Sequence, residues 1–272
     1  MIDIHRRRLA VPPRDRRGPL ITVVVVAAVL GVTHVLAWRA TEVSPAALVD
    51  GWQGMARFLG EALPPDLAWD RVVLPGIEAC LTTLAIGLLG TTLSIPPALA
   101  LAILGARTST PGQSVYQASR SVMSFLRAVP DVVFALIFVT AVGLGPFAGV
   151  LALICHNVGV MGKLWSEAME EADTGPSDAL RVAGASELQV VANAVLPAVV
   201  PSLVGLLLYR FDVNVRSSLV LGLVGAGGVG FLINQSIQLF AFDEMLTYIL
   251  MVLILIVAVD LLSAAIRRRL AT

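Results

Sequence analysis

Long apolar blocks separated by polar segments dominate the 272-residue chain. A block of about 20 apolar residues is long enough to cross the hydrocarbon core of a membrane as a helix. Prolines and glycines interrupt several blocks, which a helical bundle tolerates where neighbouring helices satisfy the freed backbone groups. The pattern predicts an all-α polytopic membrane protein with about six spans, at Pro19–Trp38, Gly76–Leu104, Val129–Gly143, Phe147–Met161, Ala198–Phe211 and Met245–Ile266.

The composition agrees with this class. Hydrophobic residues make up 57% of the chain and charged residues 14%, whereas soluble domains carry about 25% charged residues. The formal net charge is zero, so the basic footprint of a nucleic-acid-binding protein is missing. Cys80 and Cys155 lie in apolar runs without the spacing of a metal or redox site, which indicates structural thiols.

The distribution of charge predicts the orientation in the membrane. An even number of spans places both termini on one side, and basic residues favour the cytoplasmic side. The segment from Arg39 to Leu74 is richer in acids and is expected outside. With both termini in the cytoplasm, most of the 19 basic residues lie inside: Arg6, Arg7, Arg8, Arg14, Arg16, Arg17, Arg107, Arg120, Arg127, Lys163, Arg181, Arg267, Arg268 and Arg269.

The first apolar block could also be read as a signal peptide, because arginines precede it. It is longer than a typical signal core and lacks a clear small-x-small cleavage site. We therefore expect a retained span. Residues 1–74 then hold a basic cytoplasmic N-terminus, the first span and an extracytoplasmic segment, followed by a transmembrane domain at 75–272.

A polar segment from Lys163 to Pro197 separates two of the predicted spans. Good helix formers occupy Asp178–Ala183, Gly184 interrupts them, and Ser186 with Gln189 fits a capping box that starts a second helix. Pro197 follows where the next span begins, a position that tolerates a missing amide hydrogen. This pattern predicts a helix, a glycine turn and a second helix in the cytoplasm. A solvated surface hairpin would explain it equally well.

The same segment resembles the EAA loop of ABC importer permeases. That family's pattern is Glu-Ala-Ala, three residues, Gly, nine residues, Ile, one residue and Leu-Pro. Here Gly184 and the Leu-Pro pair keep their spacing, while Asp178, Leu180 and Ala194 depart from the pattern. The residues that the resemblance assigns to coupling with an ATPase are Asp178, Ala179, Leu180, Gly184, Ala185, Ser186, Leu196 and Pro197.

The resemblance implies that the two short helices dock into a groove on a separate ATP-binding subunit. ATP and Mg²⁺ would bind to that partner, because this sequence has no G-x-x-x-x-G-K-[ST] loop. We therefore expect neither enzymatic activity, nor a cofactor, nor a metal site in this chain.

A glycine-rich segment, GAGGVG, satisfies the G-x-G-x-x-G pattern of dinucleotide-binding sites. Such a site must follow a strand and open a helix within a βαβ unit, whereas this segment lies between two predicted spans. We expect the glycines to permit either non-helical turns near the outer mouth or close helix packing. These residues are Gly225, Gly227, Gly228 and Gly230.

Charged residues at the end of the fifth block offer a candidate site. Charges near the membrane interior are expensive and usually face the bundle, a partner or water. If the helix continues, Asp212 and Arg216 can pair at i, i+4. The cluster is either interfacial or lines the route of an oxyanion, which a guanidinium matches. The candidate residues for that route are Arg210, Asp212, Asn214, Arg216, Ser217, Ser218 and Asn157.

His156 and Asn157 lie at membrane depth in the fourth block, and inter-helix hydrogen bonds are the favoured interpretation over contact with a transported substrate. The acids Glu167, Glu170, Glu171 and Asp173 are expected to form a solvated face rather than a metal site.

Three segments resemble permeases of phosphonate-type ABC importers, the PhnE family: LRAVPDVVFALIF from Leu126, GASELQVVANAVLP from Gly184, and YRFDVNVRSSLVLGLVGAGGVG from Tyr209. The likeness runs from about Pro75 to the C-terminus. It implies a MetI-like permease in a prokaryotic cytoplasmic membrane that imports phosphonate, phosphate or phosphite. The implied partners are a second copy of the chain, two ATP-binding subunits, an extracytoplasmic substrate-binding protein and membrane lipid. No role is carried over to Asp131, which stands where the family has a glutamate.

Two other classes of membrane protein predict different sequence features. An ion-gradient-driven secondary transporter predicts inverted repeats around acidic residues at the midplane, and the sequence contains no convincing repeat. A membrane enzyme needs converging ligands or a nucleophile beside its base, and the three histidines are too dispersed.

Overall fold

The structure, a computed structural model, describes the backbone of residues 17–270 and the side chains of residues 21–269. Every regular element in this range is a helix, which confirms the all-α prediction. His5 and five of the N-terminal arginines, Arg6, Arg7, Arg8, Arg14 and Arg16, lie outside the described residues. The chain divides into two compact units, residues 1–57 and residues 58–272.

The first unit contains the first predicted span. Helix α1 (Arg17–Ala40) is followed by the short helix α2 (Pro45–Asp50) and by α3 (Trp52–Ala62), which continues into the second unit. Apolar side chains are exposed all around α1, as expected for a helix surrounded by lipid. The hydroxyl oxygen of Ser44 caps α2 by accepting a hydrogen bond from the backbone N–H of Ala47 at 3.3 Å.

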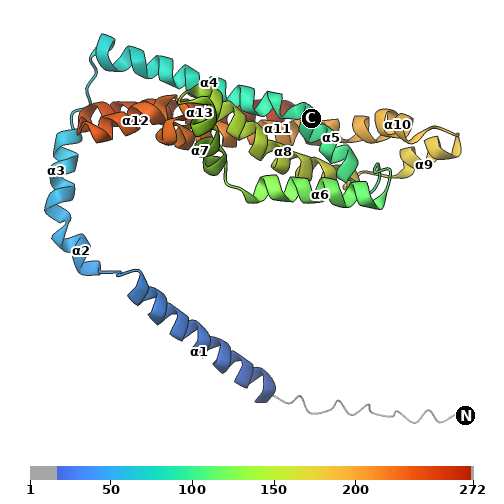
Figure 1. Cartoon of the computed structure of the whole chain (residues 1–272), viewed down its shortest axis with the longest axis horizontal. Coiled ribbons are helices and arrows are strands. Elements are labelled where there is room, and N and C mark those ends of the chain that lie inside the picture. The colour runs from blue at the N-terminus through green and yellow to red at the C-terminus, as the bar shows by residue number, and fades with distance from the viewer. Residues whose placement is uncertain (1–16, 271–272) are drawn as a thin grey trace, which may run out of the picture. The chain divides into compact units, whose positions relative to one another are not determined.

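The second unit is a bundle of long helices that run side by side, with α9 and α10 at one end and α12 at the other (Figure 1). Helix α8 is central, because it packs against α4, α5, α6, α7 and α11. A π-helical turn, η1 (Trp69–Val73), leads into α4. The bundle helices are α4 (Leu74–Leu93), α5 (Ile95–Gly105), α6 (Gln113–Ala128), α7 (Asp131–Val142), α8 (Pro146–Glu171), α11 (Leu196–Leu221), α12 (Val229–Gln238) and α13 (Phe242–Leu270).

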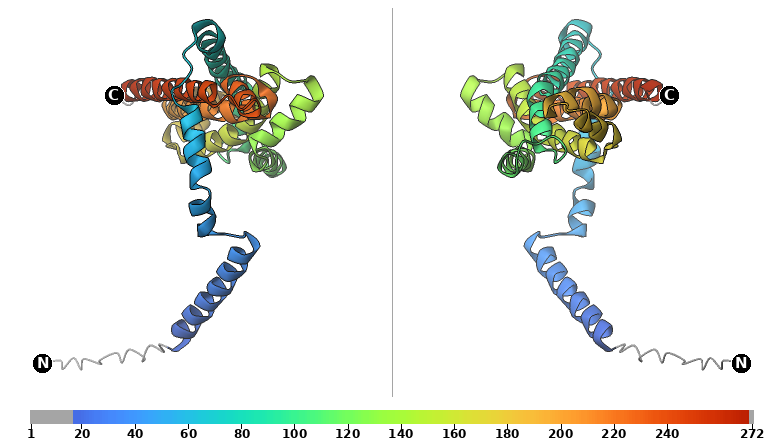
Figure 2. Two further views of the ribbon diagram at one scale, coloured as in Figure 1. Left: turned by 90° about the vertical axis from the view of Figure 1, so that its left-hand side faces the viewer. Right: turned by 90° about the vertical axis from the view of Figure 1, so that its right-hand side faces the viewer.

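Among the described residues, five helical segments are long and apolar enough to span a membrane, or six when the bent pair of α6 and α7 is counted as one span. The two helices of this pair meet at 84°, so Figure 2 shows α6 end-on and α7 from the side. Pro130 explains the break, because it lacks an N–H and disfavours helical geometry at the preceding Val129, whose ψ is 121°. The prediction of about six spans is confirmed.

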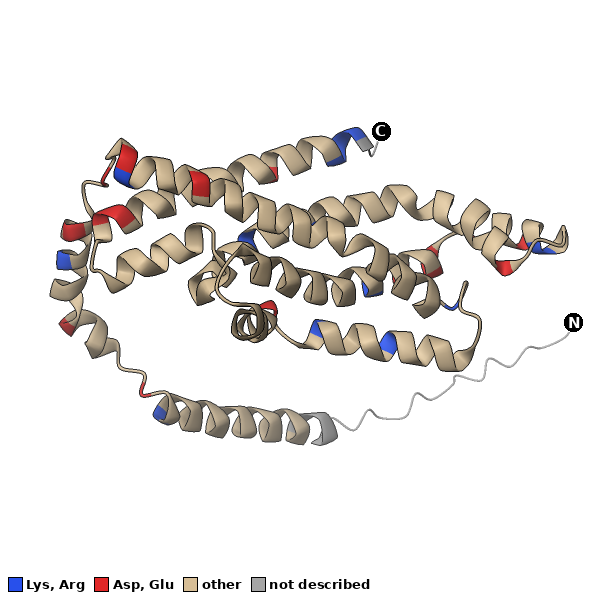
Figure 3. Cartoon of the chain, turned by 45° about the horizontal axis from the view of Figure 1, so that its top comes forward, with Lys and Arg blue, Asp and Glu red and all other residues tan. Residues whose placement is uncertain are grey.

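Two helices are longer than the hydrophobic pattern predicts. Helix α8 continues past Met161 to Glu171, and α11 continues past Phe211 to Leu221. Charges on a helix surface do not end a helix when they pair one turn apart, as Lys163 and Glu167 do at 2.8 Å in α8. In Figure 3 most charged residues lie near the ends of the long helices and few lie along their middle.

Candidate functional site

The polar segment between α8 and α11 forms the predicted helix, glycine turn and helix. Helix α9 (Gly175–Val182) and the short α10 (Glu187–Val190) flank Gly184, which has a φ of +85°. That left-handed conformation favours glycine. Ser186 and Gln189 form both hydrogen bonds of a capping box, which starts α10 as the sequence predicts. We call residues 175–190 the hairpin.

Arg181 holds the hairpin together and ties it to the bundle. Its Nε and Nη2 atoms donate to the two carboxylate oxygens of Glu187, each at 3.2 Å, and Nη1 donates to Asp178 at 3.2 Å. Nη2 also donates to the carbonyl oxygen of Thr108, in the loop between α5 and α6, at 3.0 Å. The hydrogen bond with Glu187, followed by the effect of Asp178, raises the pKa of the Arg181 guanidinium.

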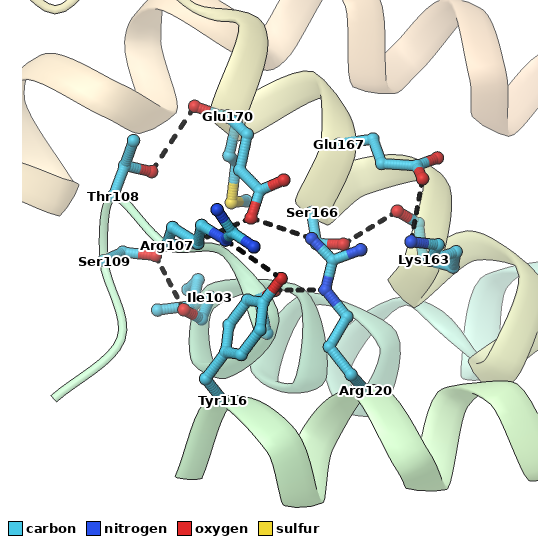
Figure 4. A network of polar contacts seen from close by, with 12 residues as sticks. Ile103, Arg107, Thr108, Ser109, Tyr116, Arg120, Lys163, Ser166, Glu167 and Glu170 are labelled. Atoms are coloured by element: carbon cyan, nitrogen blue, oxygen red, sulfur yellow. Dashed lines mark hydrogen bonds and ion pairs between the residues drawn. The ribbon is translucent and has the colours of Figure 1, made fainter. Parts of the chain in front are cut away.

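A second polar network lies beside Thr108, at the end of α8 (Figure 4). A carboxylate oxygen of Glu170 accepts a hydrogen bond from the backbone N–H of Arg107 at 2.9 Å and forms an ion pair with Arg120 at 2.8 Å. Tyr116 lies between the two arginines, whose guanidinium carbons are 5.5 and 5.1 Å from its ring centroid. Glu170 therefore joins α8, the α5–α6 loop and α6, rather than belonging to a solvated acidic face.

The predicted coupling residues divide between the surface and the bundle. Asp178, Ala179, Gly184 and Ser186 are exposed. Leu180, Ala185 and Leu196 pack against a core cluster that includes Trp165 and Met169. The most exposed large apolar side chains among the described residues are also in the hairpin: Val182, 91% exposed, and Leu188, 80% exposed. Sequence analysis did not single out this apolar pair, although its position on either side of Gly184 was visible in the pattern.

The hairpin joins α11 without a break. Helix α10 is followed directly by a π-helical turn, η2 (Val191–Val195), and then by α11. Pro197 is the second residue of α11, where the sequence places it, and the wider turn before it accommodates the missing backbone N–H. One helical run therefore extends from Glu187 to Leu221.

The candidate charges of the fifth block lie along α11 rather than at the end of a span. Arg210 is 8% exposed. Its Nη2 donates to the side-chain oxygen of Asn157 in α8 at 2.7 Å and to that of Asn214, one turn away, at 3.4 Å. Its buried Nε has no hydrogen-bond partner among the described residues. The structure thus brings Arg210, Asn157 and Asn214 together.

The two asparagines extend this contact to α4. The amide nitrogen of Asn214 donates to the hydroxyl of Thr91 at 2.7 Å, and that hydroxyl donates to the carbonyl oxygen of Gly87 at 2.6 Å. The amide nitrogen of Asn157 donates to the carbonyl oxygen of Gly90 at 3.3 Å. Asn157, Asn214 and Thr91 are all buried. The inter-helix hydrogen bond favoured for Asn157 is present.

The remaining candidates form separate contacts. Asp212 pairs with Arg216 at 2.8 Å, as the i, i+4 spacing predicts, and Arg216 is also 3.9 Å from Asp260 of α13. Ser218 donates to the carbonyl oxygens of Thr83 and of Val215, its i−3 residue, at 3.1 and 2.7 Å. Ser217 is half-buried. These four residues do not share a hydrogen bond with Arg210.

His156 lies at the break between α6 and α7. Its Nδ1 atom is 3.2 Å from the carbonyl oxygen of Val129, the residue before the helix-breaking proline. The favoured inter-helix contact is therefore present for His156 as well.

The glycine-rich segment ends the α11 run. Gly225, Gly227 and Gly228 have φ values of +96°, +78° and +73°, so the segment makes non-helical turns that glycine permits. A side-chain carbon on Gly230 would overlap the carbonyl oxygen of Leu219. The two expected roles, turn and close packing, are thus both present at different glycines.

Comparison with known proteins identifies the family. A family model described as the binding-protein-dependent transport system inner membrane component matches residues 98–272. The phosphate-import permease protein PhnE of Mycolicibacterium smegmatis is 41% identical over 236 residues, which cover 87% of this chain and 44% of the relative. The phosphite transport system permease protein PtxC of Stutzerimonas stutzeri is 37% identical over 243 residues, covering 89% and 87%. The chain thus spans less than half of the mycobacterial relative but most of PtxC.

Solved structures share the fold. The inward-facing MetNI methionine ABC transporter matches with a TM-score of 0.62 and 21% identity, over 75% of this chain and 99% of the other. A bacterial alginate ABC transporter matches with a TM-score of 0.61 and 14% identity, over 94% and 98%. From the family match and the PtxC relationship, we conclude that this chain belongs to the binding-protein-dependent transport system inner membrane components.

Proposed function

We propose that this chain is the permease subunit of an ATP-driven importer of phosphorus oxyanions, namely phosphonate, phosphate or phosphite. The observation that carries the proposal is that relatives over most of the chain are named as phosphate and phosphite permeases. A shorter relative, 40% identical over 118 residues, is named as a putative cryptic phosphonate transport system permease protein. The buried guanidinium of Arg210 supports an anionic substrate.

The proposed assembly contains two copies of this chain, two ATP-binding subunits that hold Mg²⁺ and ATP, and an extracytoplasmic substrate-binding protein. One hairpin per chain supports a homodimer, because two ATPase subunits then each receive one hairpin. The family description itself refers to a binding protein. The complex would lie in the cytoplasmic membrane of a prokaryote with both termini of this chain inside, and the permease itself would hydrolyse no ATP.

The hairpin is the proposed docking surface for the ATP-binding subunit. Val182 and Leu188 expose apolar side chains on both sides of Gly184, and exposed apolar groups rimmed by polar residues mark protein interaction sites. Arg181 and its two carboxylate partners hold the backbone behind them. We expect Leu188→Asp to abolish co-purification of the ATP-binding subunit, with Leu144→Asp, at an exposed site outside the hairpin, as the control.

Reconstitution tests the proposal directly. The chain, its ATP-binding subunit and its binding protein are placed in liposomes, and uptake of radiolabelled phosphate, phosphite and methylphosphonate is measured with and without ATP. We expect ATP-dependent uptake of at least one of the three. Uptake driven by an ion gradient through the chain alone would instead establish a secondary transporter, and absence of uptake of all three would reject the substrate class.

A further inference from the structure

Arg210 is a buried cation whose partners are neutral. Its two hydrogen-bond acceptors are the amide oxygens of Asn157 and Asn214, and Nε has no partner among the described residues. No carboxylate in that part of the chain forms an ion pair with Arg210. The nearby Asp212 is already paired with Arg216.

A buried cation without a direct anionic partner destabilises the folded state, so we expect it to have a function. Removing an ionised group from water is costly, and amide dipoles orient a charge without neutralising it. In membrane proteins, buried ionisable residues generally mark substrate or ion pathways. Asp131 attracts Arg210 through space but forms no ion pair with it, so the guanidinium lacks a direct anionic partner among the described residues.

The surrounding frame holds the guanidinium in place. Asn157 and Asn214 are anchored on α4 through Gly90 and Thr91. At Gly90 an added side-chain carbon would lie 2.6 Å from Leu153 of α8, so α4 and α8 approach closely there. Because all three helices contribute, Arg210 cannot turn away from its position without breaking buried hydrogen bonds.

We propose that Arg210 is an anion-binding residue on the translocation route, where it binds the phosphorus oxyanion in transit, with Asn157 and Asn214 as positioning residues. Guanidinium donors match the oxygens of phosphate-like groups in charge and geometry. Only Nη2 is engaged, so Nε and Nη1 form no hydrogen bond among the described residues. This inference rests on the proposed function. It narrows the sequence-derived candidates, because Asp212, Arg216, Ser217 and Ser218 are engaged or placed elsewhere.

The first test replaces Arg210 in the reconstituted complex and measures uptake of phosphate, phosphite and methylphosphonate. We expect Arg210→Gln, which can still hydrogen-bond to Asn157, to lower uptake at least tenfold. Arg210→Lys keeps the charge without the planar fork and should give an intermediate rate. Arg216→Lys is the matched control: Arg216 is 51% exposed, its ion pair survives the change, and uptake should stay within twofold of wild type.

The second test supplies a direct anionic partner from within the protein. Asn157→Asp places a carboxylate beside Arg210, which should raise the melting temperature of the complex and lower uptake at least tenfold, because the internal anion occupies the guanidinium. A purely structural role predicts the same rise in melting temperature but normal uptake, so uptake is the measurement that separates the two roles.

The two proposals fail separately. ATP-dependent uptake by the wild-type complex tests the proposed function, whatever Arg210 does. If that uptake is present and Arg210→Gln or Asn157→Asp transports at the wild-type rate per ATP hydrolysed, the site at Arg210 is rejected while the importer stands. ATP hydrolysis stimulated by the loaded binding protein should remain in both variants, which excludes misfolding as the cause of lost uptake.

Discussion

Arg181 donates hydrogen bonds to both carboxylate oxygens of Glu187 across the glycine turn, and the same guanidinium donates to the carbonyl oxygen of Thr108 in the α5–α6 loop. The contact therefore links the two helices of the hairpin to each other and to a neighbouring part of the bundle. A planar guanidinium can make all these bonds at once, whereas an ammonium group cannot reproduce the fork.

We predict that Arg181→Ala uncouples ATP hydrolysis from transport. Exposed ion pairs are worth about 0.2–1 kcal/mol, so the melting temperature should change little, while uptake per ATP hydrolysed falls several-fold. Lys163→Ala is the control, because it removes a pair of similar kind that lies within a single helix. Equal uptake per ATP in the two variants would refute the link.

Glu170 should matter more for stability than its neighbour Glu167. Glu170→Gln weakens the ion pair with Arg120 and the bond from the backbone N–H of Arg107, and charge-assisted hydrogen bonds contribute about 1.5–3 kcal/mol. We expect a clearly lower melting temperature for Glu170→Gln than for Glu167→Gln, because Glu167 pairs with Lys163 on its own helix and with no other described residue. Thermal unfolding of the purified complex measures both.

Gly184 provides a test of backbone geometry without steric interference. A side-chain carbon there would meet no atom within 4 Å, yet φ is +85°, and a left-handed conformation costs most L-residues about 1–2 kcal/mol. Gly184→Val should weaken co-purification of the ATP-binding subunit, whereas Gly184→Asn should retain it, because asparagine tolerates this conformation. Similar co-purification of the two variants would show that the turn geometry is not required for docking.

Gly230 and Gly205 form a pair with opposite expectations. Gly230→Ala forces a methyl group into the carbonyl of Leu219, whereas at Gly205 nothing lies within 4 Å. Overpacking typically costs about 1–3 kcal/mol, while alanine in an open helix position is favoured over glycine by about 0.5–1 kcal/mol. Melting temperatures should fall for Gly230→Ala and hold or rise for Gly205→Ala, and a reversed order would contradict the close packing.

Much of the fold could be predicted from local patterns in the sequence. The apolar blocks predicted the spans, and the capping box at Ser186 and the turn at Gly184 were legible because their partners lie within a few residues. The predicted ends of α8 and α11 fall too early in the chain. The hydrophobic pattern stops at Lys163 and Asp212, whereas the backbone hydrogen bonding of each helix continues. Helix α12 was not anticipated, since it is shorter than a span.

The contacts of the candidate sites could be predicted only where both partners lie within a few residues of each other in the sequence. Asp212 and Arg216 pair at a spacing that any helix imposes, so their contact was predictable. The selection of Arg210 over Arg216 depends on Asn157, 53 residues away in the chain, and Arg181 meets Thr108 at a separation of 73 residues. Such contacts are set by the packing of α8, α9 and α11, and no local pattern encodes them.

The helical run from Glu187 to Leu221, which includes a π-helical turn and Pro201, connects the end of the hairpin to the buried guanidinium. At 1.5 Å per residue, Glu187 and Arg210 are roughly 35 Å apart along it. A tilt of about 5° around the hairpin would displace Arg210 by roughly 3 Å, about one hydrogen-bond length. If the hairpin docks on the ATPase and Arg210 binds the anion, as we propose, a small rotation at the hairpin would be enough to form or break that contact.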